Sequence, residues 1–105
     1  MKPMIRAWLK QQFGDDESLF CELYSQYRMD MEAGMKALRE IRASEDGEKL
    51  RQKAHALKGI ALVVGDQETA NVCIALQHAA EARELAQQDA LIRQLATLVS
   101  ALSVE

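Results

Sequence analysis

The sequence is poor in residues that interrupt helices and in residues that favour strands. It has one proline, Pro3, and five scattered glycines in 105 residues. Valine, isoleucine and threonine are sparse, and no Asn-Gly or Asp-Gly pair separates two runs of alternating polarity. These absences argue against a β-sheet. Alanine, leucine, glutamate, glutamine, arginine and methionine, which are strong helix formers, dominate instead, so we expect an all-α fold.

Positive charge and long apolar runs are also scarce. The net charge is −3, which argues against a nucleic-acid-binding protein because such proteins carry a basic surplus. No apolar run approaches the ~18 residues of a membrane-spanning helix. No basic start is followed by the apolar stretch of a signal peptide. We therefore expect a cytoplasmic protein that does not insert directly into a membrane.

Cysteine and histidine occur only twice each. Cys21 and Cys73 fall inside helical patterns, and we expect both to be reduced thiols that pack as small apolar groups. His55 and His78 belong to no His-Glu-x-x-His or paired Glu-x-x-His motif, so we expect no metal site. The sequence also lacks a nucleophile elbow, a glycine-rich phosphate loop and a kinase signature. We therefore expect no ATP hydrolysis and no kinase activity of its own.

Apolar residues recur at helical spacing along the whole chain. Pro3 suits the first turn of a short helix that ends near Gly14 and that we expect to lie across the end of a bundle. A long helix is predicted for Asp16–Ala43. Its apolar stripe includes Gly34, which predicts a close contact with another helix.

Three further helices complete the predicted fold. One runs from about Glu48 to Val64, and Asp66 caps the next. The residues expected on or beside the inner face of that helix are Val72, Cys73, Leu76, Ala79, Ala80 and Arg83. The pattern lapses at Arg83–Gln88, and Asp89 is expected to cap the last helix. Because the connections are short, residues 1–105 are predicted to form one domain, an antiparallel up-down-up-down four-helix bundle with the short N-terminal helix across one end.

His55 lies off the apolar stripe of its helix. Arg51 precedes it by four residues, and Lys58 and Gly59 follow by three and four, so all share one helix face. Imidazole has a nucleophilic nitrogen near neutral pH and can accept a phosphoryl group, whose charge the two cations would offset. Gly59 would leave room for a partner's active site, and Leu62 would offer an apolar contact. An ordinary surface histidine fits the same spacing.

Residues 54–59 read Ala-His-Ala-Leu-Lys-Gly, a glycine follows at position 65, and positions 73–76 read Cys-Ile-Ala-Leu. This pattern resembles the signature of the histidine phosphotransfer (HPt) family, Ala-His-x-Leu-Lys-Gly followed by a glycine and a Cys-x-x-Leu step. The resemblance covers essentially the whole chain. Four positions depart from the family pattern: Ile60, Asp66, Thr69 and Gln77, the last of which replaces a residue that is usually acidic.

The resemblance implies a phosphorelay intermediate of two-component signalling. Such domains accept a phosphoryl group from a receiver-domain aspartyl phosphate and pass it to the receiver of a response regulator. It implies that Nε2 of His55 is phosphorylated, that Gln77 orients the ring, and that the surface facing the receiver includes Arg51, Lys58, Gly59 and Leu62. The domain would have no cofactor of its own, and Mg²⁺ would belong to the receiver.

The resemblance also suggests where the domain comes from. We expect a monomer, and we favour the end of a bacterial hybrid sensor histidine kinase, which would tether it to the inner membrane, over a free-standing protein. Three alternatives stay open. The chain could be an HPt-like docking module that binds receivers without accepting phosphate, a helical interaction protein with an incidental histidine, or a metal-binding bundle.

Overall fold

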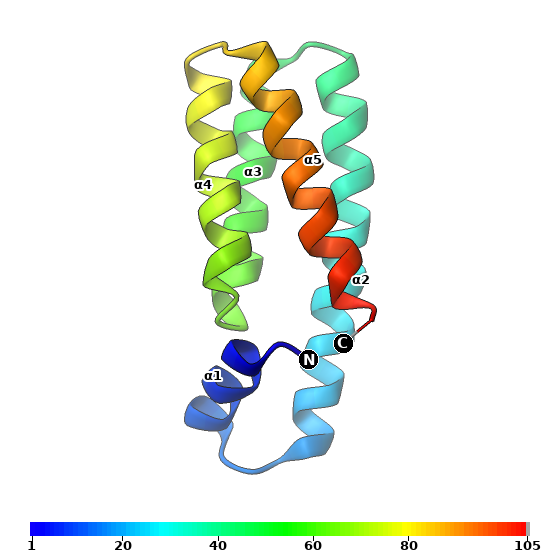
Figure 1. Cartoon of the computed structure of the whole chain (residues 1–105), viewed down its shortest axis with the longest axis vertical. Helices are drawn as coiled ribbons and strands as arrows, with labels where there is room; N and C mark the ends of the chain where they lie inside the picture. The colour runs from blue at the N-terminus through cyan, green and yellow to red at the C-terminus, as the bar shows by residue number, and fades with distance from the viewer. Residues whose placement is uncertain (105) are drawn as a thin grey trace.

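The computed structural model describes residues 1–104, which contain five helices and no strand. The helices are α1 (Pro3–Phe13), α2 (Glu17–Ala43), α3 (Gly47–Val63), α4 (Gln67–Glu81) and α5 (Leu85–Leu102). The all-α class predicted from the composition is therefore confirmed. In Figure 1, α2 to α5 lie along the long axis, and the chain reverses direction at each turn between them. No helix in residues 1–104 combines the length and the apolarity needed to cross a bilayer.

The four long helices pack as a ring of neighbours. The interface between α3 and α4 is the most extensive, α2 packs on α3, and α5 packs on α4. A smaller interface between α2 and α5 closes the ring. The α3–α4 pair and the α2–α5 pair therefore form opposite faces of the molecule (Figure 1).

The helix ends follow from capping residues that the sequence makes visible. The side chains of Asp16, Asp46 and Asp66 each accept a hydrogen bond from the backbone N–H three residues further on. This bond satisfies a backbone donor that the first turn of a helix leaves unpaired. Gly14 and Gly65 follow the ends of α1 and α3 with a φ of +73°, a conformation that glycine adopts without steric penalty. The predicted ends of both helices are confirmed.

The start of α5 differs from the prediction. The helix begins at Leu85, one turn before Asp89. The Gln88 side chain is buried, and its Nε2 donates a 3.1 Å hydrogen bond to the carbonyl oxygen of Ala79. Asp89 does not cap the helix but accepts a 2.8 Å hydrogen bond from Nε of Arg42. Apolar periodicity cannot detect a glutamine that is buried through a bond to a distant carbonyl, which explains the error.

Two other predicted positions are wrong. Arg83 does not lie on the inner face of α4, because that helix ends at Glu81 and Arg83 is exposed in the following turn with a φ of +58°. Cys21 is exposed on α2 and so does not pack as a small apolar group. Cys73 is buried as expected, and both thiols are free.

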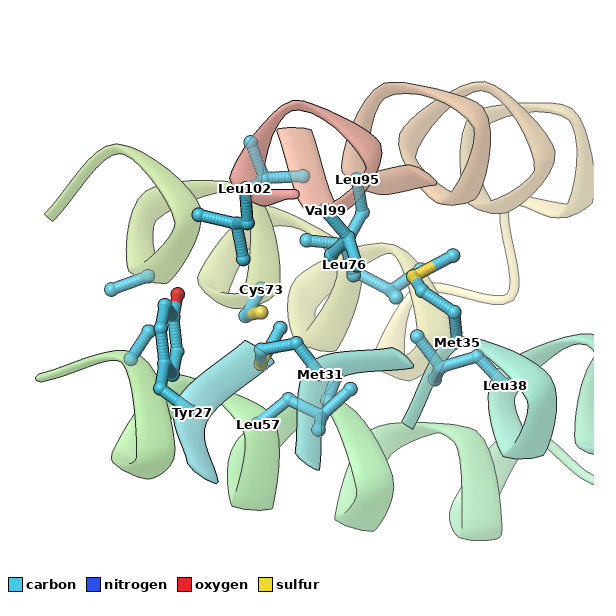
Figure 2. Close-up of a cluster of buried hydrophobic side chains, with 14 of the residues drawn as sticks. Tyr27, Met31, Met35, Leu38, Leu57, Cys73, Leu76, Leu95, Val99 and Leu102 are labelled. Carbon is cyan, nitrogen blue, oxygen red and sulfur yellow. The ribbon is translucent and has the colours of Figure 1, made fainter. Parts of the chain in front are cut away.

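The apolar core runs between the four long helices. Figure 2 shows side chains from all of them meeting there: Tyr27, Met31, Met35, Leu38, Leu57, Cys73, Leu76, Leu95, Val99 and Leu102. At Gly34, a Cβ atom would lie 2.5 Å from Cδ2 of Leu57. This distance is shorter than van der Waals contact, so a larger residue there would force the Leu57 side chain of α3 to shift. The predicted helix contact at Gly34 is confirmed.

The short helix α1 covers the turn between α3 and α4 at one end of the molecule (Figure 1). Its Ile5 and Leu9 are fully buried. Nε1 of Trp8 donates a 3.1 Å hydrogen bond to the carbonyl oxygen of Val63, at the last turn of α3. These contacts attach α1 to the end of the helix that carries His55.

Candidate functional site

His55 is exposed near the middle of α3. The apolar residues on either side of it, Ala54, Leu57 and Ala61, are fully buried. Their burial fixes the rotation of α3 about its axis, because residues three and four positions apart share a helix face. The histidine is thereby turned toward solvent, as its place off the apolar stripe predicts.

Gln77 of α4 lies beside the imidazole. Nδ1 of His55 is 3.3 Å from Oε1 of Gln77. An amide oxygen can only accept a hydrogen bond, so this contact requires the proton to be on Nδ1. The tautomer with the proton on Nδ1 leaves a lone pair on Nε2. The structure thus brings His55 and Gln77 together across the α3–α4 interface, and the free nitrogen is the one that does not face Gln77.

The two cations near His55 differ in their surroundings. Arg51 donates to Glu48 from Nη2 at 2.6 Å and from Nε at 3.0 Å. These hydrogen bonds raise the pKa of Arg51 and lower the pKa of Glu48. Lys58 is half-buried and forms no ion pair with any residue in the range 1–104. Lys58 is therefore the cation whose charge is available to a ligand, whereas the charge of Arg51 is already paired.

Gly59 leaves open space next to the histidine. It is exposed, and a Cβ atom at this position would meet nothing within 4 Å. No contact inside the molecule therefore requires glycine at position 59, in contrast to Gly34. Leu62 is 39% exposed further along α3, and Val63 is 68% exposed beside it. Val63 is not among the residues predicted from the sequence, although its place off the apolar stripe was a usable signal.

The site is a surface rather than a cavity. The structure has cavities of about 750 and 380 Å³, and neither includes His55 among its lining residues. Among residues 1–104, no group of three or more histidine, cysteine, aspartate or glutamate side chains is arranged to hold a metal ion. An imidazole on an open helix face is accessible to a group presented from outside the molecule. The fold and the site therefore define a helical module with a histidine exposed on its surface.

A comparison with known families gives this class a name. The Hpt domain family matches residues 22–105, and the chain belongs to this family. Members of the family carry out phosphotransfer through histidine in two-component signalling, with response-regulator receivers as partners. The match begins within α2, so α1 lies outside it. No curated protein and no solved structure matches the chain.

Proposed function

We propose that this protein is a phosphorelay intermediate in which Nε2 of His55 accepts a phosphoryl group from an aspartyl phosphate and passes it to a second receiver. The observation that carries the assignment is the 3.3 Å contact between His55 Nδ1 and Gln77 Oε1 on an exposed helix face. It leaves the lone pair on the nitrogen that a receiver can reach. The proposed scaffold is an antiparallel up-down-up-down bundle with α1 across one end.

The proposed phosphoryl transfer needs no catalytic base from this chain. The lone pair of His55 Nε2 attacks phosphorus, and the nitrogen–phosphorus bond forms as the bond to the aspartate oxygen breaks. The aspartate carboxylate leaves with the electron pair. The ring keeps its Nδ1 proton and becomes cationic, and Gln77 Oε1 stabilises that cation by accepting its hydrogen bond. Attack by the carboxylate of the second receiver reverses these steps and restores the neutral ring.

The residues around His55 fit separate parts of this proposal. Lys58 would offset the negative charge that the phosphoryl group brings to the helix. Arg51 would add to this effect if it left its ion pair with Glu48 and bound the phosphoryl group. Gly59 would provide clearance for the receiver, and Leu62 would give it an apolar contact. We place Mg²⁺ in the acidic site of the receiver, which the charge of Lys58 complements. We also place the domain in the cytoplasm, as a monomer, within a bacterial hybrid sensor kinase.

The test is a transfer assay with a radiolabelled, phosphorylated receiver. We expect the wild-type chain to gain an acid-labile, alkali-stable label and His55→Gln to gain none. His78→Gln is the matched control, because His78 is also exposed, in the last turn of α4. It should be labelled like the wild type. Label on His55→Gln would show that another residue accepts the phosphoryl group and would overturn the assignment.

A second measurement separates transfer from docking. Lys58→Ala should slow transfer with unchanged helicity by far-UV circular dichroism, because the substitution removes charge and leaves the core intact. Receiver binding by His55→Gln, measured by calorimetry, should survive, since the imidazole is a small part of the contact surface. If the wild-type chain binds its receiver but never gains label from it, the protein is a docking module and the phosphorelay assignment is wrong.

A further inference from the structure

A groove between α2 and α5 lies on the face of the molecule opposite to His55. Its volume is about 380 Å³. It is lined by Arg39, Arg42, Ala43, Asp89, Ile92 and Arg93. His55 and Gln77 belong to α3 and α4, which form the other side of the ring of helices (Figure 1). A receiver that covers His55 therefore leaves this groove accessible.

The groove has a positive surplus in a chain whose total charge is negative. Three arginines against one aspartate among the lining residues leave two positive charges. Arg42 donates to Asp89 from Nε at 2.8 Å and from Nη2 at 3.3 Å, so the acidic residue of the groove is already neutralised. Arg39 and Arg93 are exposed and form no ion pair within residues 1–104. Both guanidinium groups are available to an anionic partner.

Apolar surface lies between these cations. Ala43 of α2, which is exposed, and Ile92 of α5, which is 8% exposed, line the groove together with the arginines. A phosphate ion or a nucleic acid backbone would pair with the arginines and leave this apolar surface uncovered. A peptide with an apolar side chain between two acidic residues would cover it and place a carboxylate near each free arginine.

We propose that the α2–α5 groove docks an acidic protein segment that carries one apolar anchor residue. Charge complementarity selects the acidic residues, and contact with Ile92 selects the anchor. The docked segment and a receiver at His55 would occupy opposite faces at the same time. The groove would therefore raise the local concentration of a partner without taking part in phosphotransfer.

The probe is a fluorescein-labelled peptide, Glu-Asp-Glu-Leu-Asp-Glu-Glu, titrated with the complete chain by fluorescence anisotropy. We expect Arg39→Glu/Arg93→Glu to weaken binding by about tenfold or more, which corresponds to at least about 1.4 kcal/mol. Lys49→Glu/Lys53→Glu is the matched control, because it changes the net charge equally on α3, outside the groove. The control should keep the wild-type affinity. A peptide with serine in place of leucine should bind more weakly than the probe.

Four results would overturn this inference. Equal weakening by both double variants would show that only the overall charge matters. Equal affinity for the leucine peptide and an oligothymidylate of the same charge would show that the groove does not select an apolar anchor. Self-association of the chain that the arginine variant abolishes, detected by sedimentation, would make a second copy the occupant. Loss of peptide binding in His55→Gln would place the peptide on the α3–α4 face. Retained peptide binding in this variant supports the groove, whether or not the chain accepts a phosphoryl group in the transfer assay.

Discussion

Nδ1 of His55 and Oε1 of Gln77 lie 3.3 Å apart, although the two residues belong to different helices. The contact depends on how closely α3 and α4 approach each other. The α3–α4 interface is the most extensive of the molecule, and each of the two helices buries small residues completely, Ala54 and Ala61 on α3 and Ala70 on α4. Small side chains allow two helix axes to come close together. A glutamine on one helix can then reach an imidazole that the other helix directs toward solvent.

This contact predicts the tautomer of His55. Gln77→Ala removes the acceptor at Nδ1, so the population with the proton on Nε2 should rise, because the Nε2–H tautomer predominates in a histidine side chain that is surrounded by water. Gln77→Glu keeps an acceptor and should retain the Nδ1–H tautomer. Heteronuclear NMR of the ring nitrogens measures both populations. Transfer should slow by about tenfold in Gln77→Ala, the size of effect seen when a group that orients a histidine is lost. Unchanged ring-nitrogen shifts in Gln77→Ala would contradict the role of Gln77.

Substitutions of two glycines on neighbouring helices should have different effects on the free energy of unfolding. A Cβ atom added at Gly59 meets no neighbour within 4 Å, so the free energy of unfolding of Gly59→Gln should stay the same or rise by up to about 1 kcal/mol. Receiver binding should weaken, because the new side chain occupies the space beside His55. Gly34→Ala should instead lower the free energy of unfolding by about 1–3 kcal/mol, since Leu57 is fully buried and cannot move away freely.

Urea unfolding and receiver calorimetry on the same samples separate these two effects. Gly34→Ala keeps the open surface at Gly59 and should bind the receiver normally under conditions in which it is folded. Wild-type receiver affinity in Gly59→Gln would mean that the receiver does not approach this part of α3.

The spacing of apolar residues was sufficient to predict which side chains lie on a given face of one helix. Gly34 lies on the apolar stripe of α2, and its close contact with α3 follows from that position. The outward direction of His55 follows from the burial of its neighbours in sequence. Each conclusion needs only helical periodicity and the size of one side chain.

Features that depend on pairs of distant residues could not be predicted in this way. Gln88 is buried because it bonds the carbonyl oxygen of Ala79 across a turn, so α5 starts before its apolar stripe does. Asp66 was predicted only as a helix cap, yet it also accepts a hydrogen bond from Tyr27 of α2. Cys21 looks like a core residue in the sequence, and only the packing of α2 shows that it faces solvent.

Gly65, in the turn after α3, should tolerate substitution less well than Gly14. Gly14 and Gly65 share a φ of +73°, but only Gly65 has a neighbour, because a Cβ there would overlap Cβ and Cγ of Trp8. Gly14→Ala should therefore lose only about 1–3 kcal/mol through backbone strain. Gly65→Ala should lose more and displace α1. Trp8 is the single tryptophan, so a red shift of the emission in Gly65→Ala alone would report this displacement. Equal destabilisation without a shift would contradict the contact.

The cysteines predict selective alkylation. Burial, and to a lesser extent the charge of Asp66, raises the pKa of Cys73 to about 12. The reactive species is the thiolate, so this thiol should be inert in the folded protein. Cys21 is exposed. Iodoacetamide should add one group to the native chain, none to Cys21→Ser, and two to the wild type in urea, as measured by mass spectrometry. A native adduct on Cys21→Ser would show that the core opens around Cys73.

Asp66 is fully buried and connects α2, the first turn of α4 and Lys2, which precedes α1. It accepts 2.7 Å hydrogen bonds from the hydroxyl groups of Tyr27 and Thr69, and Lys2 Nζ lies 3.0 Å from its Oδ1. Burial alone would raise the pKa of Asp66, but the hydrogen bonds from Tyr27, Thr69 and Lys2 outweigh it and hold the pKa below its usual value. The folded protein thus favours the ionised carboxylate.

This depressed pKa predicts how stability depends on pH. The stabilisation is complete above the unfolded-state pKa of about 3.9 and is lost as the pH falls through the lower, folded-state pKa. Asp66→Asn should lose about 3 kcal/mol near neutral pH, because the largely buried charge of Lys2 then keeps only its exposed partner, Glu68. The variant should also lose less stability than the wild type on acidification. Asp15→Asn is the control, since Asp15 has an exposed partner, Lys10, at 3.4 Å, and its acid dependence should parallel the wild type. Urea unfolding, followed by circular dichroism at neutral and acidic pH, measures the free energy of unfolding of each variant. If this free energy falls with pH in the same way for Asp66→Asn and the wild type, Asp66 does not stay ionised in the folded protein.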